Sequence, residues 1–310
     1  MESWDLIIIG AGAAGLAAGI YGVRSGLKTL VLEEEIAGGT TADAPLVENY
    51  LGFDSVNGLE LSQKMVAHAK KQGVQINEFE KVTSLDLKGE KKIVKTERAT
   101  YQTRAIVIAS GSNYRQLGVP GEKEFRGRGV SYCGLCDGPL FKGKRLVVVG
   151  GGNSALITAL YLAHLALEIK VVHRRDVFRA EEALVRDLKN TKNAEIFWGT
   201  EVKEIRGENV VKSVLLLDKR TEQTRELPID GVFVQVGEAP NSQMAKEAGV
   251  SMNDNDYVIV DAVQHTNIAG VYAAGDVSTY PVKQIGTAVG QGITAALEAY
   301  DFIRRPYYKR

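Results

Sequence analysis

Short apolar runs that lead directly into glycine-rich turns dominate the pattern of this chain. Residues 6–9 read Leu-Ile-Ile-Ile before Gly10, and residues 146–149 read Leu-Val-Val-Val before Gly150. Each turn precedes an alanine- and leucine-rich stretch and then a second apolar run. Runs of about four apolar residues next to glycine are typical of strands buried in a parallel sheet. The alternation of strand and helix patterns therefore predicts an α/β fold built from two similar units.

The first unit carries a dinucleotide-binding pattern. Gly10, Gly12 and Gly15 form G-x-G-x-x-G between an apolar strand and a helical stretch that begins near Ala13. The first glycine permits a tight turn, the second lets the backbone approach a pyrophosphate, and the third allows the helix to pack on the strand. Free N–H groups at the helix N-terminus then face the phosphates. Glu33, 23 residues after Gly10, is expected to accept a hydrogen bond from a ribose 2′-hydroxyl.

The second unit repeats this design with the opposite charge after its second strand. Its turn reads G-x-G-x-x-A, a permitted variant. The same spacing of 23 residues leads from Gly150 to His173, which is followed by Arg174 and Arg175. Arginine binds a 2′-phosphate bidentately, whereas a carboxylate repels it, so this site is predicted to prefer NADPH to NADH. The residues predicted to bind NADPH are Gly150, Gly152, Asn153, Ser154, Ala155, His173, Arg174, Arg175 and Arg179. Two ordinary glycine turns and a solvated arginine pair are the alternatives.

The only two cysteines of the chain, Cys133 and Cys136, are separated by two residues and are followed at once by Asp137. Such a pair can close a small disulfide ring, and each thiol can resolve the mixed disulfide of the other. Asp137 is placed to move a proton as a thiolate attacks or leaves. Tight zinc binding needs four ligands, and the four histidines are scattered, so no metal site is expected. Inert buried thiols and a solvated loop aspartate are the simpler readings.

Composition and charge exclude several classes of function. The 310 residues contain 38 basic and 38 acidic side chains, a balance that gives no long-range field for nucleic acid or an anionic membrane. No run approaches the roughly 18 to 20 apolar residues that span a bilayer. A strand pattern, not a signal peptide, starts near the N-terminus, so a cytoplasmic location is expected. In a reducing compartment, closely spaced cysteines are more often catalytic or metal-binding than structural.

The remaining patterns indicate how two domains are connected. An amphipathic helix is predicted over 59–72, closed by Gly73. An apolar strand at 105–109 ends at Ser110-Gly111, which we interpret as one crossing between domains, and a second crossing is expected near 237–242. Later, Gly275-Asp276 ends a strand, and a helix of small residues over 286–299 permits close approach to a flat ring.

Taken together, these motifs resemble the low-molecular-weight thioredoxin reductases, members of the flavoprotein pyridine nucleotide-disulfide oxidoreductase family. The resemblance covers nearly the whole chain. Its strongest pieces are Gly10 to Gly15, Gly38-Gly39, Glu48-Asn49-Tyr50, Cys133 to Gly138, Gly150 to Ala155, His173 to Ala180, Gly275-Asp276 and Gln284 to Gln291.

The resemblance implies two Rossmann-like three-layer domains, with an NADPH domain (113–241) inserted into an FAD domain (1–112 and 242–310). It also implies a homodimer and a thioredoxin-like protein disulfide as substrate. Electrons would pass from NADPH through FAD to the Cys133–Cys136 disulfide, with alternating access by rotation of the inserted domain. Cys136 resembles the thiol beside the flavin, Cys133 resembles the thiol that attacks the partner, and Asp137 resembles the acid/base. The implied FAD contacts are Gly10, Gly12, Ala13, Gly15, Glu33, Gly39, Thr40, Asn49, Ser110, Gly111, Gly275, Asp276, Lys283, Gln284 and Ile285.

Several positions depart from the family pattern, and they keep alternatives open. Thr40, Leu51 and Lys283 replace the usual glutamine, proline and arginine, and Ile157-Thr158 stand where acidic residues usually follow the second turn. One alternative is the same scaffold with another donor or acceptor, such as NADH, a reduced ferredoxin or flavin, a glutaredoxin-like protein, or oxygen. Another is a redox sensor without turnover.

Overall fold

The computed structural model describes residues 2–44 and 47–304. It divides the chain into two compact units, one comprising Met1–Ala44, Glu48–Asn113 and Ala239–Arg310, and the other Pro45–Val47 and Tyr114–Glu238. The passages between units thus lie at 113/114 and 238/239, compared with 112/113 and 241/242 expected from the sequence. Residues 305–310 of the last expected segment lie outside the described residues. Which cofactor belongs to which unit stays a prediction at this point.

A seven-stranded sheet forms the centre of the first unit. Its strands are β1 (Glu2–Ile9), β2 (Thr29–Leu32), β3 (Gln75–Asn77), β4 (Val82–Asp86), β5 (Lys92–Thr96), β6 (Thr100–Ile108) and β17 (Val271–Ala273). The order is β3-β2-β1-β6-β5-β4, with β17 also paired to β6. The pairs among β1, β2, β3, β6 and β17 are parallel, whereas β4 and β5 form an antiparallel edge.

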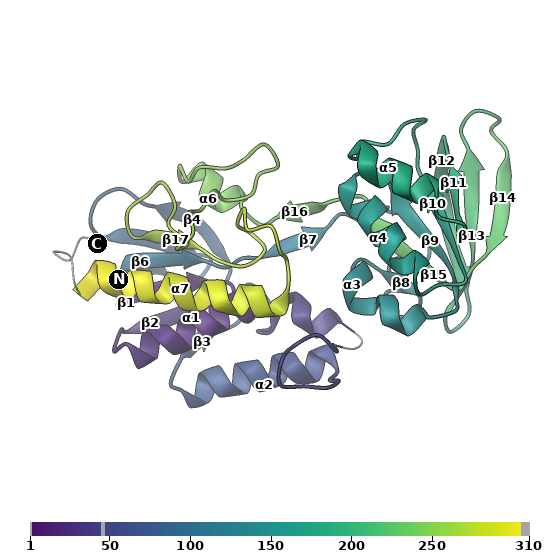
Figure 1. The fold of residues 1–310 in the computed structure, drawn as a ribbon. Helices are drawn as coiled ribbons and strands as arrows, with labels where there is room; N and C mark the ends of the chain where they lie inside the picture. Colours follow the sequence, from purple (N-terminus) through teal and green to yellow (C-terminus); the bar gives the residue numbers. More distant parts are fainter. Residues whose placement is uncertain (1, 45–46, 305–310) are drawn as a thin grey trace. The chain divides into compact units, whose positions relative to one another are not determined.

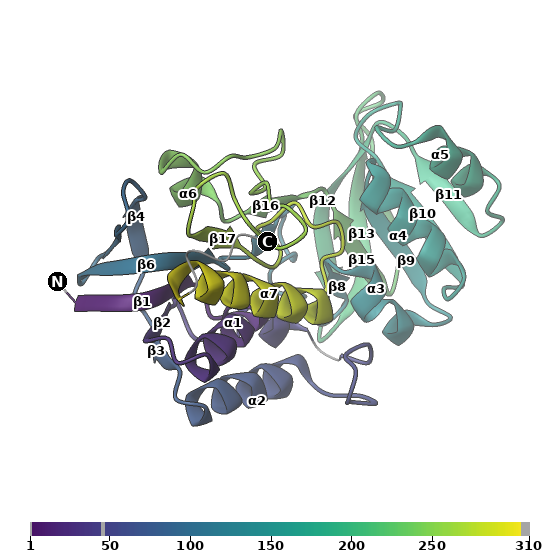
Figure 2. The same cartoon turned by 60° about the vertical axis from the view of Figure 1, so that its left-hand side comes forward.

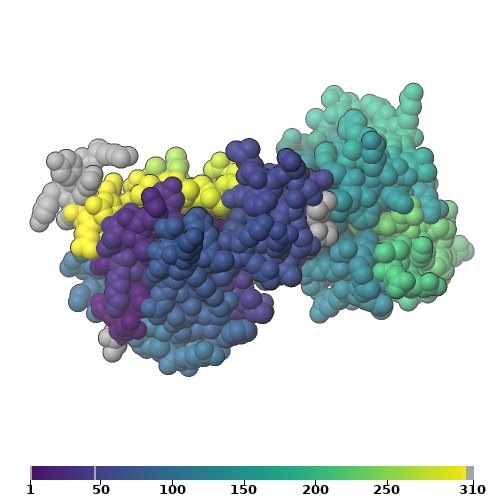
Figure 3. All heavy atoms as spheres, turned by 90° about the horizontal axis from the view of Figure 1, so that it is seen from below, coloured from purple at the N-terminus to yellow at the C-terminus, as the bar shows by residue number. Residues whose placement is uncertain are grey.

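Two hydrophobic layers enclose this sheet because successive side chains of a strand point to opposite faces. Leu6 and Ile8 belong to one core cluster, and Ile7 and Ile9 belong to another. The helical segments are α1 (Ala13–Arg24), the 3-10 turn η1 (Gly39–Asp43), α2 (Gly58–Lys71), α6 (Gln243–Glu247) and α7 (Ile285–Arg304). Helices α1 and α7 pack side by side over the first layer (Figures 1 and 2). Their neighbouring surfaces, purple and yellow, are visible in Figure 3.

The second unit repeats the strand–turn–helix order on a smaller parallel sheet. Its sheet strands are β8 (Val130–Ser131), β9 (Arg145–Gly150), β10 (Glu168–Val172), β11 (Ala194–Phe197) and β15 (Gly231–Gln235), in the order β11-β10-β9-β15-β8. The other elements are α3 (Gly134–Asp137), η2 (Gly138–Phe141), α4 (Asn153–Ala163), α5 (Glu182–Lys189), and an antiparallel sheet of β12 (Thr200–Gly207), β13 (Val211–Asp218) and β14 (Thr224–Pro228).

The second unit is also layered, with α4 and α5 on one face of its sheet and the antiparallel strands on the other (Figure 1). Leu146 and Val148 join the helical side of the core, whereas Val147 and Val149 join the other side. The α/β class predicted from the sequence is confirmed, and one unit is inserted in the sequence of the other.

Two short strands, β7 (Ser112–Tyr114) and β16 (Glu238–Pro240), carry the chain from one unit to the other and pair as a two-stranded sheet. The Ser110 hydroxyl donates to the carbonyl of Asn241 at 2.7 Å, and the Asn241 amide donates to the Ser110 carbonyl at 2.9 Å. Both passages are therefore held together by hydrogen bonds on the side of the first unit.

Close packing of α1 on α7 yields a stability prediction. A Cβ added at Gly292 would lie 2.1 Å from the carbonyl oxygen of Ala14, whereas one added at Gly290 on the same helix would meet open space. Gly292→Ala is expected to destabilise the protein by about 1–3 kcal/mol because the helices must separate. Gly290→Ala, the matched control, should be neutral or stabilising by up to about 1 kcal/mol. Urea unfolding measures both, and equal effects would contradict this packing.

Candidate active site

The first glycine turn places the N-terminus of α1 against three other segments of the same unit. A Cβ at Gly10 (φ 103°) would lie 2.3 Å from the Ala109 carbonyl oxygen, and one at Gly39 would lie 2.8 Å from Cα of Gly12. Gly275 lies equally close, because its added Cβ would be 3.0 Å from Cβ of Ala14. Gly12 caps α1 without a side chain, so the N–H groups of the first turn are left for a ligand. This glycine-lined backbone fits a dinucleotide pyrophosphate.

Glu33 stands at the end of β2, and both of its carboxylate oxygens accept backbone hydrogen bonds. Oε2 accepts from the N–H of Ala11 at 2.7 Å, and Oε1 accepts from the N–H of Glu35 at 3.0 Å. The carboxylate therefore also fixes the glycine turn itself. Each oxygen keeps a second lone pair, so acceptance from a ribose hydroxyl is still chemically open.

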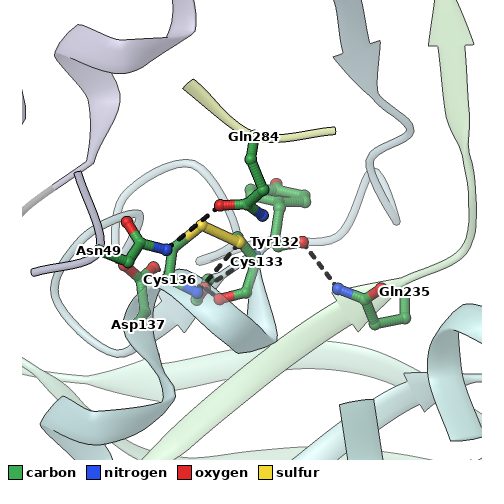
Figure 4. Close-up of a disulfide and its surroundings, with 8 residues drawn as sticks. Asn49, Tyr132, Cys133, Cys136, Asp137, Gln235 and Gln284 are labelled. Atoms are coloured by element: carbon green, nitrogen blue, oxygen red, sulfur yellow. Dashed lines mark hydrogen bonds between the residues drawn. A yellow bond between two sulfur atoms is a disulfide. The ribbon is translucent and has the colours of Figure 1, made fainter. Parts of the chain in front are cut away.

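The other predicted FAD contacts in the C-terminal part are connected to one another. Gln284 accepts a hydrogen bond from Asn49 at 3.2 Å, although the two are 235 residues apart (Figure 4). The Lys283 ammonium donates to the carbonyl of Asp276 at 3.0 Å and lies 4.6 Å from the ring centre of Tyr257. Ile285 begins α7, Thr40 lies exposed in η1, and Ser110 and Gly111 lie at the first passage between units.

The second glycine turn is held in the same way as the first, by close contact between backbones that leaves no room for a side chain. A Cβ at Gly150 would lie 2.2 Å from the Gln235 carbonyl oxygen, while Gly152, the cap of α4, has nothing within 4 Å. Ala155 is buried under the turn, and Ser154 is exposed. The side-chain amide of Asn153 donates to Glu181 at 2.9 Å and accepts from the Glu181 N–H at 2.9 Å, so Asn153 already has a structural partner.

His173 packs inside the second unit. Its ring lies where a Cβ of Gly151 would be, 2.2 Å from Cε1, and its Nε2 is 3.0 Å from the Val177 carbonyl oxygen. The ring of Phe178 lies beside it, tilted by 33°, with the two ring centres 5.4 Å apart. Burial, followed by the nearby arginines, lowers the pKa of this imidazole. The structure thus gives His173 a packing role, and its predicted contact with NADPH stays a prediction.

The arginines near His173 lie closer to the surface than the buried imidazole. Arg174 and Arg179 are exposed and Arg175 is half-buried. The backbone N–H of Arg179 donates to the Gly151 carbonyl at 2.7 Å, which brings this residue alongside the turn. Within residues 2–44 and 47–304, none of the three guanidinium groups forms an ion pair. Three cations near a helix N-terminus are suited to a phosphorylated ribose.

Cys133 and Cys136 form a disulfide at the start of α3 (Figure 4). The Cys136 N–H donates to Sγ of Cys133 at 3.2 Å, and both cysteines are half-buried. Helix α3 is held directly on α4, since a Cβ at Gly134 would lie 2.6 Å from Cγ2 of Thr158. Thr158, one of the departures from the family pattern, therefore supports the helix that carries the disulfide.

Asp137 completes this helix and is almost fully buried, with 8% of its surface exposed. Oδ2 accepts a hydrogen bond from the Ser131 hydroxyl at 2.6 Å. Oδ1 is buried and has no hydrogen-bond partner among the described residues. Burial raises the pKa of this carboxyl, and the Ser131 hydrogen bond partly opposes that rise. A carboxyl that holds its proton above the usual range is suited to protonate a thiolate.

Tyr132, directly before Cys133, is held at both ends. Gln235 donates to its carbonyl at 2.7 Å (Figure 4). The Tyr132 hydroxyl donates to Glu122 at 2.9 Å. Glu122 is 1% exposed and also accepts from the N–H groups of Leu117 and Gly118 at 2.8 and 2.7 Å. Burial, and then the Glu122 hydrogen bond, raise the pKa of Tyr132. The cysteine segment therefore starts from a fixed backbone position.

Sequence reasoning missed Ser131, Glu122, Gln235 and Glu181. None of them belongs to a motif, and each acts through a partner six or more residues away. Ser131 alone carried a weak signal, as a hydroxyl residue close before the cysteines.

A family model described as pyridine nucleotide-disulphide oxidoreductase matches residues 4–292. The chain belongs to this family. A thioredoxin reductase from Bacillus subtilis is 43% identical to it over 301 residues, 97% of this chain and 95% of that protein. A solved thioredoxin reductase from Streptococcus pyogenes has a TM-score of 0.92 and 38% identity, over 97% of this chain and 98% of that one. A ferredoxin-flavin thioredoxin reductase from Clostridium acetobutylicum has a TM-score of 0.53 and 34% identity, over 97% and 98%.

These similarities confirm the family and the fold of two dinucleotide-binding domains predicted from the sequence. Family membership implies the use of a flavin and a pyridine nucleotide by an oxidoreductase. Within the described part of the chain, every helix is too short or too polar to cross a bilayer.

The burial of Asp137 predicts a pH-dependent cost in stability. A folded-state pKa above the unfolded value of about 3.9 means that the native state binds the proton more tightly. Stability should therefore fall as pH rises from about 4 through the raised pKa, and Asp137→Asn should remove this loss. Urea unfolding of both proteins across pH is expected to show a gain for Asp137→Asn that grows with pH and then levels off. The exposed Asp254→Asn is the control, and a gain independent of pH would contradict the burial argument.

Proposed function

We propose that this protein is a thioredoxin-disulfide reductase that passes electrons from NADPH through FAD and the Cys133–Cys136 disulfide to a thioredoxin-like protein. The observation that carries the proposal is the disulfide on α3 followed at once by Asp137, a buried carboxyl whose pKa is raised by its burial. The names of relatives from Bacillus subtilis and Streptococcus pyogenes, alike over nearly the whole chain, support the same activity.

In this proposal, the first unit binds FAD through its glycine-lined turn and the segments gathered around it. A bound flavin would supply two-electron chemistry between a nicotinamide and a disulfide. Gly10, Gly12, Gly39 and Gly275 would permit its close approach to the backbone, and Glu33 would accept from a ribose hydroxyl. Lys283, Asn49 and Gln284 would hold it from the other segments of the same unit.

The chemistry of the chain itself is thiol–disulfide exchange. The thiolate of Cys133 attacks one sulfur of the partner disulfide, the partner S–S bond breaks, and a mixed disulfide forms. The departing partner sulfur takes the proton of Asp137. Cys136 then gives its proton to the ionised Asp137 and attacks Sγ of Cys133. The mixed disulfide breaks, the Cys133–Cys136 bond re-forms, and the second partner sulfur leaves as a thiolate that takes this proton from Asp137. The partner gains two electrons, and the cysteine pair loses two.

We propose NADPH as the donor because Arg174 and Arg175 directly follow His173, whose ring lies against Gly151, and because the Arg179 N–H bonds to the Gly151 carbonyl. A homodimer, which rests on the family resemblance, and the cytoplasmic location expected from the sequence pattern belong to the same proposal. A second donor class also has support, since Ile157 and Thr158 stand where acidic residues are usual, and a ferredoxin-flavin relative is similar to the chain.

Replacing either cysteine separates electron transfer from cofactor binding. Cys133→Ser and Cys136→Ser should each reduce disulfide turnover by at least about a hundredfold, because serine forms no disulfide. The flavin absorbance of the purified variants should be retained, since the proposed flavin contacts lie in the other unit. Steady-state reduction of a thioredoxin measures turnover. A variant that keeps full turnover would remove the disulfide from the proposed path.

Replacing the arginines tests the choice of nucleotide. Arg174→Gln and Arg175→Gln should lower kcat/KM for NADPH by about ten- to a hundredfold, because each removes a charge-assisted hydrogen bond to the 2′-phosphate. The value for NADH should change little. Arg186→Gln, on the exposed side of α5, is the matched control. An equal loss of kcat/KM with NADPH and NADH would show that the arginines do not distinguish the two nucleotides by the 2′-phosphate.

A further inference from the structure

The Ser131 hydroxyl lies at the centre of a small hydrogen-bonded group that contains both Asp137 and the backbone of Cys133. Its Oγ is 2.6 Å from Oδ2 of Asp137 and 3.3 Å from the Cys133 carbonyl oxygen. It also accepts the Cys133 N–H at 3.1 Å. A hydroxyl has one hydrogen, and the shorter contact, to a carboxylate, is the stronger one. Ser131 therefore donates to Asp137, while one of its two lone pairs accepts the Cys133 N–H.

This arrangement makes the two oxygens of the Asp137 carboxyl different. Oδ2 is occupied by Ser131, whereas Oδ1 is buried and has no partner among the described residues. A proton placed on Oδ2 would reverse the 2.6 Å hydrogen bond, and Ser131 would have to donate instead to the Cys133 carbonyl at 3.3 Å, a longer and weaker contact. A proton placed on Oδ1 leaves the existing hydrogen bonds intact and meets no competing protein acceptor.

Among the described residues, the helix, turn and strands nearest to Asp137 in the fold carry no charged side chain. Helix α4 and turn η2 pack against α3, and neither contains a charged residue. Strand β8 and its neighbour β15 contain none either. The titratable groups on these elements and on α3 are Tyr161 and, once the disulfide is reduced, Cys136 with the adjacent Cys133. Burial raises the pKa of Asp137, and Ser131 is the single contact that lowers it.

We propose that Ser131 is a positioning residue that occupies Oδ2 of Asp137 and leaves Oδ1 to carry and deliver the proton of the thiol–disulfide step. This inference rests on the proposed function. In that step the proton moves from Oδ1 to the sulfur that leaves the partner disulfide, and the resulting carboxylate keeps its hydrogen bond from Ser131. Ser131 thus stabilises the ionised product of proton transfer without touching the reacting sulfurs.

Two measurements on the same variants test this role. The first is a titration of the Asp137 carboxyl by carbon-13 NMR in protein labelled at aspartate, with its signal identified by its loss in Asp137→Asn. The second is the pH profile of kcat and KM for thioredoxin reduction. The variants are Ser131→Ala, Ser131→Gly as a second way to remove the hydroxyl, and Ser131→Thr, which keeps it. Ser84→Ala, at an exposed position of the other unit, is the control.

In Ser131→Ala and Ser131→Gly, the midpoint of the Asp137 titration should shift to higher pH, because the carboxylate loses a hydrogen bond. The part of the kcat–pH profile that reports the ionisation of Asp137 should shift in the same direction. KM should stay unchanged, and Ser131→Thr should restore the profile. An unchanged midpoint without the hydroxyl, or an equal shift in Ser131→Thr, would overturn the proposal. The NMR titration needs no turnover. A midpoint that moves as expected in a protein that reduces no thioredoxin with any donor would instead refute the proposed function and, with it, the delivery of the proton.

Discussion

Close backbone contact at glycine is the constraint on which both units depend. At Gly10 and Gly150 a side chain would collide with the carbonyl oxygen of the neighbouring strand, so the turn that opens each helix exists only without one. The same principle sets Gly134 against Thr158 and so places the disulfide helix on the helix of the second glycine turn. One steric rule thereby shapes two nucleotide-type turns and fixes the redox pair relative to the second of them.

The electrostatics of the cysteine site follow from what surrounds it. Asp137 is placed among apolar and uncharged neighbours, where ionisation is costly, and one hydroxyl softens that cost. Burial of this carboxyl lowers the stability of the folded protein once Asp137 ionises. The same burial raises its pKa, which favours the carboxyl as a proton donor. Tyr132, tied to Glu122 and Gln235, keeps the backbone before the cysteines in place, so the carboxyl and the sulfurs hold a defined spacing.

Much of the fold could be predicted from the sequence because apolar strands, glycine turns and helices follow one another within short distances. The positions of Gly10, Gly150 and the cysteine pair required no tertiary information. The direction in which a side chain points, by contrast, could be known only from the tertiary structure. Counting residues placed His173 at the end of a strand, but the fold turns its ring into the core beside Phe178. Asp137 was predicted as the acid/base from its position. Its burial and the hydrogen bond that it accepts from Ser131 appear only in the fold, where Ser131 lies on β8 beside the distant strand β15.

The central claim is that electrons enter from NADPH and reach a thioredoxin disulfide through a bound flavin and the Cys133–Cys136 pair. The most direct test is an anaerobic titration of the purified protein with NADPH, and with NADH in parallel, while the flavin absorbance band is recorded. The account predicts that near-stoichiometric NADPH bleaches the band and that NADH does so only at much higher concentration. A band that dithionite bleaches but NADPH leaves unchanged would contradict it, and would direct the search to another electron donor.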